Sequence, residues 1–182
     1  MQRHPIQKWD PRAALDHTWT FQRVEFDGAD PDRERIQALR SIIKEYREHP
    51  TIHAFAVRIL RQGGARARDY AQQARIIHGW VQRNLLFVHE AGDMFTCPDR
   101  VLFQGGGDCD CHTAVVGSLL ETVRIPANIV VLRRNGRGFH VYAEAKIPPN
   151  GRGRWVPMET TLPVPMGWDP RKASPDEIRR LV

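Results

Sequence analysis

At 182 residues the chain is long enough to bury a core without disulfide bonds, so we expect one domain or one domain with extensions. Three cysteines are an odd number, which argues against a secreted disulfide framework and favours folding in a reducing compartment, the cytoplasm. The net charge of +6 comes from arginines scattered along the chain and suits an anionic partner without specifying one. No run of residues has the pattern of a signal peptide or a membrane span.

The N-terminal half predicts an extension followed by three helices. Residues 1–30 are rich in charge and turn formers, and 18–26 have the pattern of one strand. Apolar residues then recur at three- and four-residue steps, as on amphipathic helices. We expect Pro50 to end the first helix, Thr51 to cap the second and the glycine pair at 63–64 to end the second. The three predicted helices cover 32–48, 51–62 and 67–85.

The C-terminal half predicts a loop, one more helix and a sheet. Residues 87–107 lack periodicity and predict a long loop that frames a site. An apolar helix follows over 109–123 and stops before Pro126. The period then changes to two, which predicts antiparallel strands joined by the turn sequences NGRG and PPNGRG. The fold class is therefore α+β. The predicted strands cover 128–134, 139–147 and 154–159.

These elements divide the chain into three parts. We expect an N-terminal extension over 1–30, a domain over 31–165 and a tail over 166–182. Within the tail, Ser174 and Glu177 have the spacing of a capping box, which predicts a short final helix.

The stretch GGGDCDCHT places Cys109 at the start of the predicted helix. The free N–H groups and the positive end of the helix dipole favour an anion there, so we expect the pKa of the Cys109 thiol to be lowered and the residue to act as a nucleophile. The preceding glycines leave room for a substrate, and the backbone amide of Cys109 can donate to an oxyanion.

A cysteine nucleophile also needs a base and a group that orients the base. His140 lies near the start of one predicted strand, and Glu159 ends the next. If the hairpin is centred near Asn150, residues whose numbers sum to about 299 face each other, as these two do. Facing residues have Cβ atoms roughly 5 Å apart, within hydrogen-bond reach for an imidazole and a carboxylate.

Three motifs, GGGDCDCHTAVVGSLLETVRIPANIV, HVYAEA and WVPMETT, together resemble the transglutaminase-like superfamily over about residues 70–161. The resemblance implies a papain-like fold and a catalytic triad of Cys109, His140 and Glu159. The chain looks most like short bacterial and phage members with a GDCDD motif, some of which are encoded among tail genes. It departs from them twice, with Glu159 where the family usually has Asp and Cys111 where an acidic residue is usual.

The cysteines allow two other interpretations. Thiolates and imidazoles are the favoured ligands of zinc, but structural zinc sites use Cys-x2-Cys spacing, and this site would need Cys97 with His78 or His89 to complete it. A redox pair is disfavoured because helical residues two apart point about 200° away from each other. We expect Cys111 to face the interior, and we expect no metal or organic cofactor.

Further residues near the motif could serve the site. His112, three residues after Cys109, could replace His140 as base, but nothing in the sequence orients it. Gln104 could supply a second oxyanion donor, and Asp108 could complement the helix N-terminus or contact substrate. Arg137, together with Arg133 and Arg134, could hold an anionic substrate. The stretch RRNGRGFHVY faintly resembles an RNA-recognition strand, but the βαββαβ order is absent and we expect no nucleic-acid partner.

The sequence therefore predicts a cysteine-dependent acyl-transfer enzyme acting on a peptide, an isopeptide or a cell-wall peptide bond. Hydrolysis is favoured over cross-linking, because the chain lacks the extra domains of large cross-linking transglutaminases. The alternative is a non-catalytic structural or assembly module that retains the fold, for example a virion protein that binds other phage tail proteins.

Overall fold

The computed structural model describes residues 30–89, 95–134 and 137–173. The predicted strand at 18–26 and the predicted helix after Ser174 lie outside these residues. No helix in the described ranges is long and apolar enough to span a membrane. In chain order the elements are α1 (Pro31–Tyr46), α2 (Pro50–Gln62), α3 (Tyr70–Asn84), β1 (Leu86–Phe87), α4 (Pro98–Gln104), β2 (Gly106–Gly107), α5 (Cys109–Thr122), β3 (Ala127–Arg134), β4 (Arg137–Ile147), β5 (Arg154–Met158) and the 3-10 helix η2 (Pro170–Lys172).

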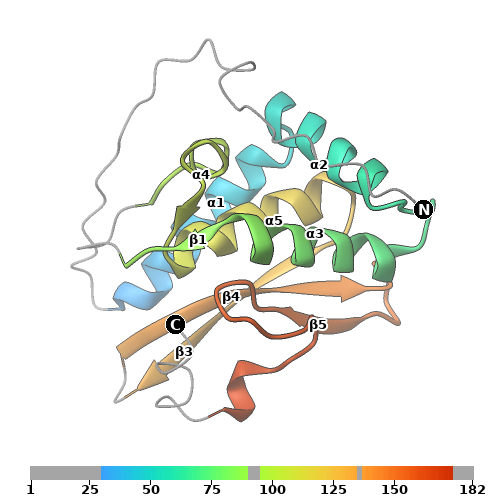
Figure 1. Ribbon diagram of the computed structural model, residues 1–182. Helices are drawn as coiled ribbons and strands as arrows, with labels where there is room; N and C mark the ends of the chain where they lie inside the picture. Colours follow the sequence, from blue (N-terminus) through green and yellow to red (C-terminus); the bar gives the residue numbers. More distant parts are fainter. Residues whose placement is uncertain (1–29, 90–94, 135–136, 174–182) are drawn as a thin grey trace.

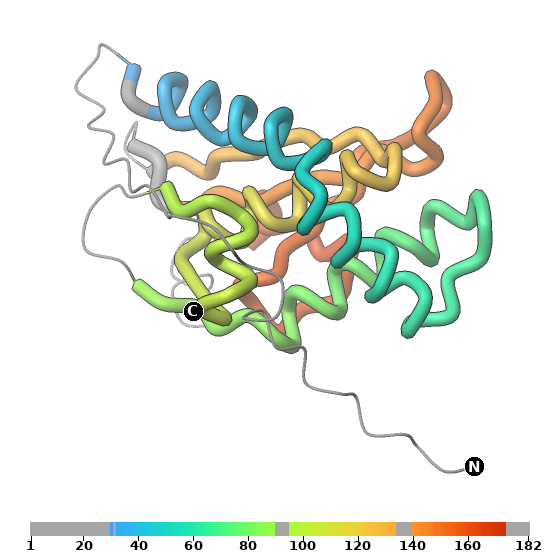
Figure 2. The backbone as a smooth tube through the Cα atoms, turned by 90° about the horizontal axis from the view of Figure 1, so that it is seen from above, coloured from blue at the N-terminus to red at the C-terminus, as the bar shows by residue number. Residues whose placement is uncertain are grey.

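The helices gather on one side of an antiparallel sheet of order β3-β4-β5 (Figure 1). A second, two-stranded sheet pairs β1 with β2 in parallel. The helix α5 contacts α1, α2, α3 and α4 as well as β3 and β4, and the view from above shows it enclosed by the other helices (Figure 2). Every residue of α5 from Asp110 to Leu120 is buried, as expected for a central helix that is covered on all sides. The α+β prediction is confirmed.

The helix boundaries follow from capping residues, with two differences from the sequence prediction. Asp69 caps α3, its Oδ1 accepting from the Gln72 amide at 3.0 Å, and Arg68 before it has a left-handed φ of 62°. The helix therefore begins at Tyr70 and not at residue 67. The predicted cap at Thr51 is wrong, because Pro50 itself opens α2, and its fixed φ suits a first helical position.

The segment 87–107 was predicted as one loop, and that prediction is wrong in part. The helix α4 lies within it, beginning with Pro98 and ending at Gly105, whose φ of 81° provides a left-handed C-terminal cap. These are standard start and stop signals. The helix has only seven residues, however, so it is too short to show a helical period in the sequence.

The three predicted strands are present, but the register between β4 and β5 differs from the expected one. Ala143 faces Met158 and Ala145 faces Val156, so facing numbers sum to 301 and not to 299. A shift of two residues keeps each side chain on the same face of the sheet, because side chains alternate with a period of two. Glu159 is therefore diagonal to His140, one of the neighbour positions that long side chains still reach.

The apolar core lies between the helices and the sheet. A main cluster joins α2, α3, α4 and α5 to residues of β4 and β5. A smaller cluster joins α1, α5, β3 and β4, and Cys109 packs at its border. Trp155 is 43% exposed on β5, where its ring lies 5.8 Å from the Lys146 ammonium. We therefore assign Trp155 to the surface.

Candidate active site

The site lies where the sheet opens between β4 and β5. The Lys146 amide donates to the Pro126 carbonyl, so the even-numbered residues of β4 direct their backbone groups toward β3 and the odd-numbered ones toward β5. Pairing with β5 ends at Ala143 and Met158. The backbone of Val141, two residues further along β4, therefore faces an edge that β5 has left free.

The first turn of α5 occupies that free edge. The Val141 amide hydrogen-bonds to the Cys109 sulfur, and the Val141 carbonyl accepts from Thr113 Oγ1 at 3.3 Å. Cys109 and Thr113 are four residues apart and so lie on one face of the helix. The side chains of α5 thus take the place of a strand partner and bring the partly exposed thiol against the residue that follows His140.

The Cys109 thiol is protonated at neutral pH. Burial, followed by the nearby carboxylates of Asp110 and Asp108, raises its pKa to about 12, and the Val141 amide and Arg35 offset this only in part. The expected lowering of the pKa by the helix N-terminus is therefore wrong for the resting protein. Desolvation and two negative neighbours outweigh the dipole, which acts only within the first turn.

His140 and Glu159 form a buried pair. His140 Nε2 lies 2.6 Å from Glu159 Oε2, and the two side chains are 4% and 0% exposed. An ionised carboxylate only accepts, so Nε2 carries a proton, and Nδ1 is an acceptor whenever the ring has only that one proton. The Tyr142 ring stacks on the imidazole, with centroids 6.3 Å apart. A shift in the β3–β4 register lies immediately before His140, a position where bulges commonly redirect a side chain.

The Glu159 carboxylate is held from both sides. Its second oxygen, Oε1, accepts from the Thr161 amide at 2.7 Å and from Thr161 Oγ1 at 2.6 Å. Burial alone would raise the pKa of Glu159, but the hydrogen bonds from His140 and Thr161 outweigh burial and keep the pKa below its ordinary value. The extra methylene of Glu relative to Asp therefore does not leave the carboxylate loose, because every bond it makes is short.

Two further histidines hold the chain around Glu159. His78 on α3 donates from Nε2 to the Glu159 carbonyl at 2.6 Å. His112 on α5 lies 3.2 Å from Thr160 Oγ1 through Nδ1 and 3.4 Å from the Leu86 carbonyl through Nε2. Burial lowers the pKa of both rings, so both are neutral near pH 7. The sequence pointed to His78 only as a possible zinc ligand and gave Thr160 and Thr161 no role, because no local pattern links residues so far apart.

The remaining predicted site residues have other surroundings. Gln104 is exposed at the end of α4, and its Nε2 donates to the Gly106 carbonyl at 2.9 Å. Asp108 caps α5, its Oδ1 accepting from the Cys111 amide at 3.0 Å. Arg137 begins β4, but its side chain lies outside the described residues. Arg133 pairs with Asp32 at 2.8 Å and with Asp30 at 3.3 Å, so its charge is neutralised within the chain.

The other two cysteines have different surroundings. Cys111 is 1% exposed in the core, as expected, and Cys97 is a partly exposed free thiol. Over the ranges that the structure describes, no group of three or more His, Cys, Asp or Glu side chains is arranged to hold a metal ion.

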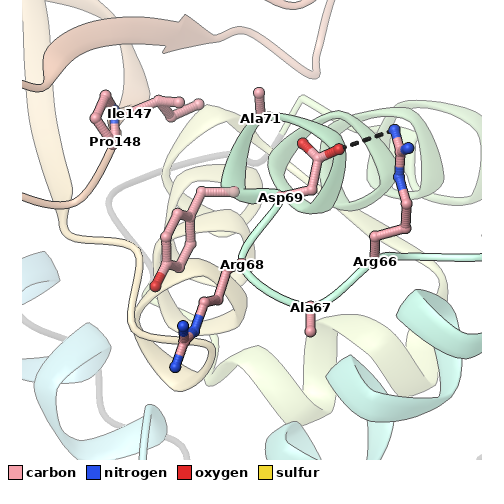
Figure 3. Close-up of a pocket in the computed structure, with 8 residues that line it drawn as sticks. Arg66, Ala67, Arg68, Asp69, Ala71, Ile147 and Pro148 are labelled. Carbon is pink, nitrogen blue, oxygen red and sulfur yellow. Dashed lines mark hydrogen bonds and ion pairs between the residues drawn. The ribbon is translucent and has the colours of Figure 1, made fainter.

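A surface depression of about 500 Å³ lies elsewhere, at the turn between α2 and α3 (Figure 3). Arg66 and Asp69 form an ion pair in it at 3.1 Å, and Ile147 and Pro148 contribute the apolar side. The depression lies beside the end of β4 opposite to His140, and its lining includes none of Cys109, His140 and Glu159, so it is separate from the candidate site.

Comparison with known proteins gave one family match and two similar structures. The family model described as the transglutaminase-like superfamily matches residues 53–160, more than half of the chain. No curated protein sequence matches the chain. A protein from Cytophaga hutchinsonii described as a "putative cysteine protease" has a TM-score of 0.50 at 18% identity, and 75% of this chain covers 49% of it. A "putative protease" from Parabacteroides distasonis ATCC 8503 has a TM-score of 0.49 at 14% identity, with 66% of this chain covering 26% of it. The chain thus spans half or less of each.

Proposed function

Since the chain belongs to the transglutaminase-like superfamily, we propose that it is a cysteine-dependent acyl-transfer enzyme in which Cys109, His140 and Glu159 form the catalytic triad. The substrate would be a carboxamide in a peptide, an isopeptide or a cell-wall peptide. The observation that carries the proposal is the 2.6 Å hydrogen bond between two fully enclosed side chains, His140 and Glu159, at the free edge of β4 where α5 presents a thiol.

The protonation states dictate the order of steps. The thiol is protonated at rest, so His140 Nδ1 takes its proton as the sulfur attacks the carbonyl carbon. The tetrahedral oxyanion is stabilised by the Cys109 amide. When the C–N bond breaks, the protonated His140 returns the proton to the departing amine and leaves a thioester. Water then attacks the thioester and gives a proton to His140. When the C–S bond breaks, His140 returns that proton to the sulfur, so that a carboxylic acid is released and the thiol is restored.

Glu159 acts by orienting His140 and by stabilising the charge that His140 gains. Its carboxylate stays ionised, because the hydrogen bonds from His140 and Thr161 lower its pKa. The ring is then fixed with the protonated nitrogen toward the acid and the free nitrogen available to the thiol, as in other nucleophile–base–acid triads.

The proposal extends to partners and location. A peptide or protein substrate is the principal partner, and the net charge of +6 suits one that is anionic. Folding in the cytoplasm with later association with a virion is consistent with a role among phage tail proteins. The alternative function is a structural or assembly module of the same fold without catalysis.

The direct test is reaction with an activated ester. We expect purified protein to release one equivalent of p-nitrophenol from p-nitrophenyl acetate in a burst, with acetyl found on Cys109 by mass spectrometry. Cys109→Ala should abolish the burst, whereas Cys97→Ala should retain it and serves as the matched control. A screen of peptide, isopeptide and cell-wall fragments with the same pair would identify the substrate class.

The structural alternative makes a different prediction. If the chain is only a scaffold, wild type and Cys109→Ala should release p-nitrophenol at the same slow rate, without a burst or acetylated Cys109. That result would overturn the proposed function.

A further inference from the structure

We propose that His112 is a positioning residue that fastens the acid-bearing segment 159–161 to the helix that carries Cys109. This inference rests on the proposed function and adds a residue to that site. His112 is 1% exposed and comes from the first turn of α5, three residues after the nucleophile. It reaches Thr160, the residue directly after the acid.

The two hydrogen bonds of His112 define its tautomer. The Leu86 carbonyl can only accept, so His112 Nε2 carries the proton and donates at 3.4 Å. Nδ1 of the neutral ring is then an acceptor, and the Thr160 hydroxyl donates to it at 3.2 Å. Both nitrogens are occupied. His112 is thus unable to serve as the alternative base considered from the sequence, and the ring instead joins three segments of the chain.

The location of these bonds gives them their effect on the site. After Met158 the chain leaves the β4–β5 ladder, so strand pairing no longer fixes the distance between Glu159 and β4. On one side of the opening, Cys109 and Thr113 bind α5 to Val141 of β4. On the other side, His112 binds the same turn of α5 to Thr160. The first turn of α5 therefore spans the opening and sets the separation at which Glu159 meets His140.

The third segment that His112 holds is the pair of short strands that precedes Cys109. The Leu86 carbonyl belongs to β1, which pairs with the glycines of β2. A Cβ atom on Gly106 would come within 2.5 Å of that carbonyl, so the approach is already close. The hydrogen bond that His112 donates to the Leu86 carbonyl keeps this backbone in place beside the nucleophile. The His112 ring thus fixes the positions of the acid, the nucleophile and the glycine segment relative to one another.

The test removes only the Thr160 hydroxyl. Thr160→Val keeps the side-chain shape but leaves His112 Nδ1 without its donor, and we expect the acylation rate constant with p-nitrophenyl acetate to fall about 10- to 100-fold, since small misplacements of catalytic groups have effects of this size. Thr122→Val is the matched control, because Thr122 donates to the Arg47 carbonyl at the far end of the same helix. It should lower the melting temperature similarly and change acylation less than about twofold.

A second readout does not depend on catalysis. The proton on His140 Nε2 is hydrogen-bonded to the Glu159 carboxylate, and protons in such hydrogen bonds give a resolved downfield NMR signal. Thr160→Val should shift or broaden that signal, whereas Thr122→Val should leave it unchanged. His112→Gln supplies both a donor and an acceptor and should recover part of the acylation rate that His112→Leu loses.

The outcomes separate the two proposals. If wild type shows no burst dependent on Cys109, the proposed function fails, while the NMR signal still reports whether Thr160 holds the His140–Glu159 pair. If wild type shows the burst but Thr160→Val matches Thr122→Val in both acylation rate and NMR signal, His112 has no positioning role and the inference is overturned.

Discussion

The two ends of the β4–β5 pair are built in different ways. At the hairpin end, facing residues from Ala143 with Met158 to Ile147 with Arg154 are joined by a regular backbone ladder. At the other end the strands separate, and side chains from α3 and α5 replace the ladder. A backbone ladder tolerates most side chains, whereas an opening held by side chains depends on each of them. We therefore expect substitutions at the open end to affect function far more than similar ones at the hairpin end.

The largest effect should come from Glu159→Gln. The amide cannot stabilise the charge that His140 gains and no longer selects its tautomer, so the acylation rate should fall about 10³- to 10⁴-fold, as when a triad acid is neutralised. Glu144→Gln is the matched control. Glu144 is a buried glutamate on the same face of β4 as His140, and it pairs with Arg171 at 3.0 Å. Burst kinetics of both variants measure the contrast. Equal losses in the two variants would contradict it.

Gly106→Ala should destabilise the site without touching a catalytic group. The new methyl would lie 2.5 Å from the Leu86 carbonyl, which is backbone and cannot move aside cheaply, so we expect a loss of about 1–3 kcal/mol in the free energy of unfolding. Gly151→Ala at the hairpin end meets nothing within 4 Å and should change stability by less than about 0.5 kcal/mol. Urea unfolding compares them. A stable Gly106→Ala variant would show that β1 and β2 can separate freely.

Acid should weaken the open end first. Three groups there, His78, His112 and Glu159, have a pKa below the ordinary value in the folded protein, so the unfolded chain binds more protons than the folded chain below about pH 6.5. Stability should therefore fall as pH decreases below that value, by up to about 1.4 kcal/mol per pH unit for each proton taken up on unfolding. Urea titrations at about pH 7.5, 6 and 5, which bracket the ordinary histidine pKa, measure the slope. His78→Asn should make it shallower.

The smallest effect concerns the reactivity of the thiol. Asp110→Asn removes a nearby negative charge, and about 1 kcal/mol of Coulomb interaction corresponds to a roughly fivefold faster alkylation of Cys109 by iodoacetamide at pH 8. In wild type the rate should keep rising through pH 10, because the pKa of the thiol is raised to about 12. Peptide mapping of the labelled protein gives the rate for Cys109 alone. A plateau below pH 8 would contradict the raised pKa.

The sequence predicted the elements that have a periodic pattern and missed those held by distant contacts. The helix from Cys109 and the three strands were foreseen because a period of 3.6 or 2 reveals them. The contact between His140 and Glu159 was foreseen from a hairpin argument whose register was wrong by two residues. The predicted contact still forms because a register error of two residues leaves Glu159 on the same face of the sheet. An error of one residue would have moved Glu159 to the other face.

Other features had no local signal. The helix α4 is too short for a period, and the contacts of His78 and His112 join residues 81 and 48 positions apart. The raised pKa of Cys109 could not be foreseen either, because a helix start predicts the dipole but not the burial that opposes it.

The protonated state of Cys109 has a consequence for damage by peroxides. Oxidation to sulfenic and sulfinic acid proceeds through the thiolate, and its rate follows the fraction of thiol that is ionised. A sulfur whose pKa is raised to about 12 exposes almost no thiolate at neutral pH. The resting nucleophile should therefore persist in an oxidising environment, becoming reactive only during the moment when His140 removes its proton.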